Sequence, residues 1–112
     1  MSSATDQREL SSNFEGDSVY LAAGEDVTFN MGSGTDAKTG TSHVKYLNLP
    51  GGIAYGIDVY PTVACSVTAI NGKPLKAAQS ISTFGWKENL ARIWSFKIQA
   101  GTATTVEVKG KC

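Results

Sequence analysis

Short runs of strictly alternating apolar and polar residues recur along this chain, and they limit the fold more than any other feature. In residues 92–99, the apolar side chains Trp94 and Phe96 alternate with polar neighbours, and residues 104–109 repeat the pattern. A period of two places one side-chain set on one face of a β-strand. A shift of one residue would turn Trp94 and Phe96 into water. The pattern therefore predicts that both lie in the core and that the two runs form a closing hairpin around Gly101. If the two arms pair without a bulge, only a connection with an odd number of residues puts both apolar sets on one face. In one allowed register, the outward Lys97 and Glu107 lie opposite each other.

Turn residues separate the alternating runs at intervals of about 8 to 12 residues, which leaves no room for crossover helices. The chain is therefore expected to be all-β: an antiparallel β-sandwich or small barrel, jelly-roll-like or immunoglobulin-like, of about seven or eight strands. The further expected strands lie at residues 18–23, 27–31, 43–49, 53–61, 63–69 and 80–84, the first two as a hairpin.

The connections carry their own signals. Residues 32–42 contain no large apolar side chain and are expected to form a long flexible loop. Asn71-Gly72 favours a type I′ hairpin turn, and Pro74 favours an edge strand because it cannot donate to a ladder. Residues 85–91 are expected to form one helical turn.

The first 17 residues are polar and show no sustained period. Leu10 and Phe14 are their only large apolar side chains. This composition is typical of an extended arm that orders on a partner. Residues 1–17 are therefore predicted to be a flexible N-terminal arm, and residues 18–112 a single β-sandwich domain.

Charge and hydropathy exclude several classes of partner. Ten basic and ten acidic residues give no net charge, so the basic footprint of a nucleic-acid-binding protein is missing. No apolar run approaches the ~18 residues that a membrane span requires. The first residues lack the charged start and apolar middle of a signal peptide. We expect a chain made in the cytoplasm, with neither a nucleic acid nor a membrane as partner.

No motif for chemistry is complete. Residues 32–39 approximate a phosphate-binding loop, but Ala37 stands where the second glycine is required, and a strand rather than a helix is expected next. Residues 16–18 read Gly-Asp-Ser, as in one family of esterases, yet His43 is the single histidine and borders a loop. The cysteines have no metal-ligand spacing, and Cys65 is expected to be a buried thiol. We therefore expect no enzyme, no cofactor and no metal.

Trp86 is the aromatic residue with the least obvious structural role. It lies between Phe84-Gly85 and the polar run 87–89. An aromatic side chain held in such a turn is suited to stack on a sugar ring or to fill a neighbour's pocket. Folding back as a lid on the sandwich is the structural alternative.

The segments TAINGKPL and RIWSFKIQAGTATTVEVKGK, with VYLAAGEDVTF as a compatible opening, resemble small β-sandwich structural proteins of tailed bacteriophage virions. The resemblance implies a non-enzymatic subunit, a capsid cement, decoration or minor head protein, located in the virion. It would contact capsid or other virion proteins, and neighbouring copies of itself, through its arm and loops. Arg8, Leu10, Phe14 and Trp86 are the expected interface residues. The alternatives are a tail, baseplate or fibre subunit, and a carbohydrate-binding module that uses Trp86 to hold a glycan.

Overall fold

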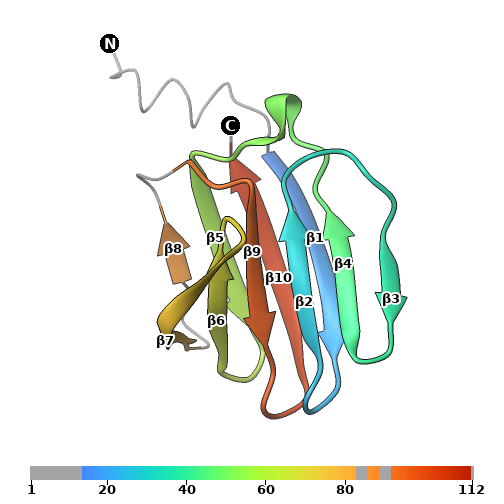
Figure 1. The fold of residues 1–112 in the computed structure, drawn as a ribbon, viewed down its shortest axis with the longest axis vertical. Helices are drawn as coiled ribbons and strands as arrows, with labels where there is room; N and C mark the ends of the chain where they lie inside the picture. The colour runs from blue at the N-terminus through green and yellow to red at the C-terminus, as the bar shows by residue number, and fades with distance from the viewer. Residues whose placement is uncertain (1–13, 83–85, 89–91, 112) are drawn as a thin grey trace.

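In the computed structural model, residues 14–82, 86–88 and 92–111 are described, and they form two β-sheets that lie face to face (Figure 1). Ten strands and one short 3-10 turn are found among these residues. They are β1 (Phe14–Leu21), β2 (Asp26–Asn30), β3 (Ala37–Thr39), β4 (Ser42–Tyr46), η1 (Pro50–Gly52), β5 (Gly56–Pro61), β6 (Cys65–Ile70), β7 (Lys73–Ile81), β8 (Trp86–Glu88), β9 (Ser95–Gln99) and β10 (Thr104–Lys111).

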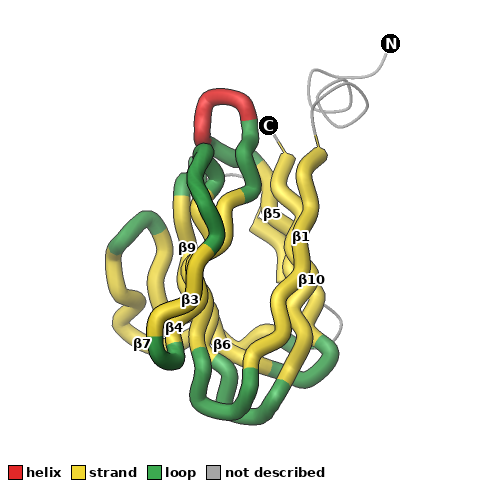
Figure 2. Tube along the Cα trace, turned by 90° about the vertical axis from the view of Figure 1, so that its right-hand side faces the viewer, coloured by secondary structure: helices red, strands yellow, loops and turns green. Residues whose placement is uncertain are grey.

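The two sheets differ in size. One has four strands in the order β1-β10-β5-β8, and the other has six in the order β3-β4-β2-β9-β6-β7. All neighbours are antiparallel except β2 and β4, which are parallel. Figure 2 shows the two layers edge-on, with β1, β10 and β5 in one layer and β9, β4 and β6 in the other. This arrangement confirms the all-β sandwich.

The apolar face of each central strand points into the space between the sheets. Phe29 of β2 and Phe96 of β9 stack with their ring centroids 5.3 Å apart. Cys65 is also buried, as expected. The buried apolar residues are Val19, Leu21, Val27, Phe29, Met31, Leu47, Leu49, Ala54, Ile57, Val59, Cys65, Val67, Ile81, Ile93, Phe96, Ile98, Ala100, Val106 and Val108.

Two of the expected hairpins, the opening one and the closing one, are wrong, because their strands belong to different sheets. β9 pairs with β2 and β6, whereas β10 pairs with β1 and β5. The connection between β9 and β10 spans residues 100–103, an even number, and an unbulged hairpin of that length would put the two apolar sets on opposite faces. Crossing to the other sheet turns both sets toward one core. β1 and β2 are joined by a corner of the same kind. Because β9 and β10 belong to different sheets, Lys97 and Glu107 do not form the expected outward pair.

The expectation that Trp94 is buried is wrong as well. Trp94 is 51% exposed, and the preceding residue, Ile93, is buried instead. Ile93 forms an isolated antiparallel bridge with Ala54, and Ser95 begins the regular ladder of β9. The alternation therefore breaks between Ile93 and Phe96, and the extra residue turns Trp94 outward.

Several boundaries also differ from expectation. β1 begins at Phe14 and pairs with β10 from there, so residues 14–17 belong to the sheet and not to the arm. Residues 86–88 form a strand rather than a helical turn, and β3 lies within the expected loop. Asn71-Gly72 does form the β6–β7 turn, with φ of 54° and 76°. The expected edge position of Pro74 is confirmed, since β7 is the last strand of its sheet.

Candidate functional site

The unequal sheets leave one side of the sandwich only half covered. The corners place β1 against β2, β10 against β9 and β5 against β6, so β4 and β3 have no strand opposite them. Figure 1 shows both extending sideways past β1. The inner face of β3 and β4 therefore faces an open edge instead of a second sheet, and polar side chains can lie there at little cost.

The strand register places charged residues on that inner face. In the parallel pair, His43 lies opposite Val27 and Lys45 opposite Phe29, and both of these β2 residues point into the core. Lys38 of β3 lies opposite His43. All three basic side chains reach carboxylates at the open edge. We call this set the polar seam: Asp17, Glu25, Asp36, Lys38, His43 and Lys45.

Lys45 connects the two sheets at the seam. Its Nζ lies 2.9 Å from Oδ2 of Asp17 on β1 and 2.9 Å from Oδ2 of Asp36 in the loop before β3. Asp36 also accepts a hydrogen bond from the Tyr46 amide at 2.8 Å. The hydrogen bond from Lys45 lowers the pKa of Asp36. Burial opposes the charge on Lys45, yet hydrogen bonds to Asp17 and Asp36 raise its pKa. Asp36 and Lys45 are therefore both ionised at neutral pH.

Glu25 holds the other end of the seam. Its Oε2 lies 2.8 Å from Nζ of Lys38, and its Oε1 lies 2.9 Å from both Nε2 of His43 and the Ala22 amide. Hydrogen bonds from Lys38, His43 and Ala22 lower the pKa of Glu25 to about 2. The ionised carboxylate can only accept, so Nε2 of His43 donates. Three segments of the chain meet at this one carboxylate.

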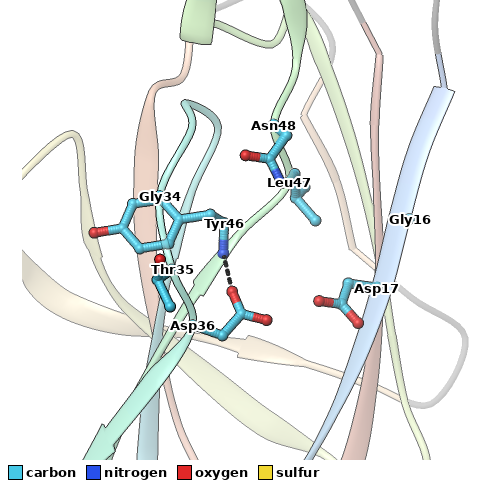
Figure 3. Close-up of a pocket in the computed structure, with 8 residues that line it drawn as sticks. All are labelled: Gly16, Asp17, Gly34, Thr35, Asp36, Tyr46, Leu47 and Asn48. Carbon is cyan, nitrogen blue, oxygen red and sulfur yellow. Dashed lines mark hydrogen bonds between the residues drawn. The ribbon is translucent and has the colours of Figure 1, made fainter.

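A recess of about 510 Å³ opens between β1 and β4 at the seam (Figure 3). Asp17 and Asp36 face each other across it, and the Tyr46 ring lies over Gly34. A Cβ on Gly34 would stand 2.5 Å from that ring, so this position requires glycine. The recess is lined by Gly16, Asp17, Gly34, Thr35, Asp36, Tyr46, Leu47 and Asn48. These groups offer hydrogen bonds and two neutralised carboxylates, and none of them is an activated nucleophile.

The fold does not bring together the incomplete motifs of the sequence into a catalytic or phosphate-binding site. His43 bonds to Glu25 rather than to Ser18. Cys65 lies on β6, which β2 and β9 separate from β4, and burial raises the pKa of its thiol to about 11. β3 follows the glycine-rich run where a phosphate loop requires a helix. Among the described residues, no group of three or more His, Cys, Asp or Glu side chains is placed to hold a metal ion.

Three of the four edge strands, β3, β7 and β8, carry features that disfavour pairing with another chain, and one amide of the fourth, β1, is bonded to a side chain. On β1, the Ser18 amide donates to Oδ1 of Asp17 at 2.7 Å. β7 carries Pro74, and its register with β6 is interrupted over residues 75–78. β3 and β8 are three residues long. Charges, prolines, bulges and short edges are the devices that prevent sheets from aggregating edge to edge.

The predicted interface residues are not brought together. Phe14 begins β1 opposite Lys111, and Trp86 begins β8 opposite Val59. β1 and β8 are the two opposite edges of the four-stranded sheet. Arg8 and Leu10 lie outside the described residues.

Sequence reasoning missed the polar seam and the exposed Trp94. One signal for the seam was present: His43 and Lys45 are in phase with Leu47 and Leu49, so a face that starts polar becomes apolar along one run. That pattern indicates a strand whose inner face is covered only at one end. The outward orientation of Trp94 left no comparable signal.

No family model, no curated protein and no solved structure matches this chain. In the part of the chain that the structure describes, no helix has the length and apolarity needed to cross a membrane.

Proposed function

We propose that this protein is a non-enzymatic structural subunit of a virus particle, which adds to a capsid or tail lattice built by other proteins. The protected edges carry this proposal. A sandwich in which three of the four edge strands are short or interrupted is poorly suited to extend itself by strand pairing, and it suits a subunit that is added to an existing lattice in a fixed number of copies.

The use of the charged groups supports the same function. The seam residues Asp17, Glu25, Asp36 and Lys45 are each engaged in ion pairs that connect separate strands. Groups held in this way lock a scaffold and are poorly suited to exchange protons with a substrate. The recess beside them therefore belongs to the framework of the subunit.

Attachment is assigned to the N-terminal segment, which leads directly into β1. A polar segment that orders on binding can cover a large surface of a partner. The start of β1 lies beside the end of β10, with Phe14 opposite Lys111. Residues 1–13 are thus tethered to the sandwich at one end, and Arg8 and Leu10 are their proposed contact residues.

The test is carried out on particles purified from cells that make the protein naturally. Mass spectrometry should find the chain in the particles, and amides of residues 1–13 should exchange hydrogen more slowly there than in the free protein. Leu10→Asp should reduce incorporation, whereas Ser12→Asp, a matched change in the same segment, should not. Particles without the chain, or equal exchange in both states, would refute the proposal.

A further inference from the structure

A second surface, on the opposite side from the seam, has features that the proposed role of the arm does not use. The β6–β7 hairpin stands off the outer side of the six-stranded layer (Figure 2). Its turn lies against the segment that leads into β9, since the Asn71 side-chain amide donates to the Arg92 carbonyl at 2.9 Å. We call this surface the hairpin face and define it by Lys73, Lys76, Arg92, Trp94 and Lys97.

Trp94 is held rigidly at this face. Its amide donates to Oδ1 of Asn71 at 2.9 Å, and its carbonyl accepts from the Met31 amide at 2.9 Å. Trp94 is nevertheless 51% exposed. A large aromatic side chain on a fixed backbone loses little entropy on binding, which is why tryptophan is enriched among residues that dominate interface energies.

A groove of about 270 Å³ begins beside Trp94, because the next residue, Ser95, lines it. Ala69 and Pro74 are apolar residues of its lining, and Lys97 lies at the same groove. Its volume falls below the ~300–1,000 Å³ of typical small-molecule sites. The groove is therefore the right size for one apolar side chain of a partner.

The hairpin face carries positive charges that no carboxylate of the described residues neutralises, although the net charge of the chain is zero. Lys73 and Lys76 are exposed on β7, and no ion pair involves either of them among the described residues. Arg92 is exposed as well, and its guanidinium lies 5.9 Å from the Tyr55 ring centroid, which leaves the charge in place. Lys97 reaches Asp26 only at 3.9 Å.

The carboxylates, in contrast, are mostly neutralised by basic side chains, and most of them lie away from the hairpin face. Most of those on the described strands and corners lie within 4 Å of a basic side chain, and most of these pairs are at the seam or on the four-stranded sheet. The pairs are Glu25 with Lys38 and His43, Asp17 and Asp36 with Lys45, Asp58 with Lys111, and Asp26 with Lys97. Among the described residues, Lys73, Lys76 and Arg92 are in none of these pairs and lie on the hairpin face, where they attract negative charge, whereas the exposed Lys109 lies apart from them on β10.

We propose that the hairpin face docks an extended acidic segment of a partner protein, with one apolar side chain in the groove and carboxylates against the lysines and Arg92. The inference rests on the proposed function in that the partner would be another virion protein. A protein segment fits better than a nucleic acid, because the groove accepts a side chain and the cations are too few to follow a phosphate backbone.

The test uses a random copolymer of glutamate and tyrosine as the probe, added to the ¹⁵N-labelled full chain. Amide shifts should change at residues 69–76 and 92–97, and affinity should fall as salt is raised. Polyglutamate, which lacks an apolar side chain, should bind more weakly. Trp94→Ala and the double variant Lys73→Glu/Lys76→Glu should each weaken binding about tenfold.

Two matched variants control for loss of any exposed aromatic or lysine. Tyr20→Ala removes an aromatic side chain that is 61% exposed on β1, and Lys109→Glu reverses an exposed lysine on β10. Both should bind as wild type does. If the Trp94→Ala variant and the Lys73→Glu/Lys76→Glu variant bound the copolymer as tightly as the wild type does, the proposal would be overturned. So would absence of binding, or tighter binding of oligothymidylate to the same residues.

The outcome separates this inference from the proposed function. If Trp94→Ala enters particles at the wild-type level and binds the copolymer unchanged, the docking face is wrong while the virion role stands. If the copolymer binds as described but no particle contains the chain, the docking face stands and the virion role is wrong.

Discussion

Replacing Phe96 and Trp94 in turn by alanine tests the strand register that distinguishes this fold from the one its alternation predicts. Phe96 is 1% exposed and stacks on Phe29, so Phe96→Ala should destabilise the protein by about 3–5 kcal/mol. Trp94 is half exposed, and its removal forfeits only part of the ~1.5–3 kcal/mol of a fully buried side chain, about 1 kcal/mol. At about 4 °C per kcal/mol for a domain of this size, Tm should fall by about 12–20 °C and about 4 °C respectively.

The assay is thermal and urea unfolding followed by far-UV circular dichroism. Tyr20→Ala serves as the control for an exposed aromatic residue and should resemble Trp94→Ala. If Phe96→Ala does not fold, Phe96→Leu should show a smaller loss in the same direction. A loss for Trp94→Ala equal to or larger than that for the Phe96 variants would place Trp94 in the core and refute its outward orientation.

Four other predictions concern single residues. Gly34→Ala should cost about 1–3 kcal/mol because its Cβ meets the Tyr46 ring, and a double-mutant cycle with Tyr46→Ala should recover part of the loss; additive losses would contradict the contact. The pKa of Glu25 lies at about 2 in the fold against 4.5 ordinarily, so its stabilisation is complete above pH 4.5 and is lost as pH falls toward 2. Tm measured against pH should therefore fall less steeply in Glu25→Gln than in the wild type, and parallel curves would exclude this role. Asn71→Ala should destabilise the protein by about 2 kcal/mol, because alanine is strained at a φ of 54° and also loses the side-chain hydrogen bonds. Asn71→Gly should cost less, because glycine adopts this φ without strain. Equal losses in urea unfolding would contradict the contribution of backbone strain. The Cys65 peptide should be alkylated by iodoacetamide only after unfolding, since its thiol is buried with a pKa of about 11, and rapid native labelling would show that β6 opens.

The inward face of most strands could be predicted from the sequence, because alternation with period two is a local property. Phe29, Phe96, Ile98, Val106 and Val108 are all buried as the pattern indicates. The partner of each strand could not be predicted, since a corner between sheets and a hairpin within one sheet satisfy the same alternation. Only the even connection 100–103 argued against the hairpin, and it did so under the assumption that no bulge was present.

The candidate site was less predictable than the fold for a related reason. Lys45 and His43 read as poor members of an apolar face until the unequal sheets are known, because their environment depends on β1 ending the smaller sheet. Trp94 was misplaced because one extra residue before β9 reverses its direction. Both errors come from tertiary arrangement, which short-range patterns do not encode.

The position of β10 has a consequence for how the chain acquires its structure. β10 is the last of the described strands in sequence order, yet it lies between β1 and β5 and pairs with both. Within the described sheet β1 has no ladder until β10 is in place, so Val19 and Leu21 stay unpaired until a contact between distant parts of the chain has closed. Closure of such distant contacts is slow, so refolding is expected on the millisecond-to-second scale of sequence-distant β topologies.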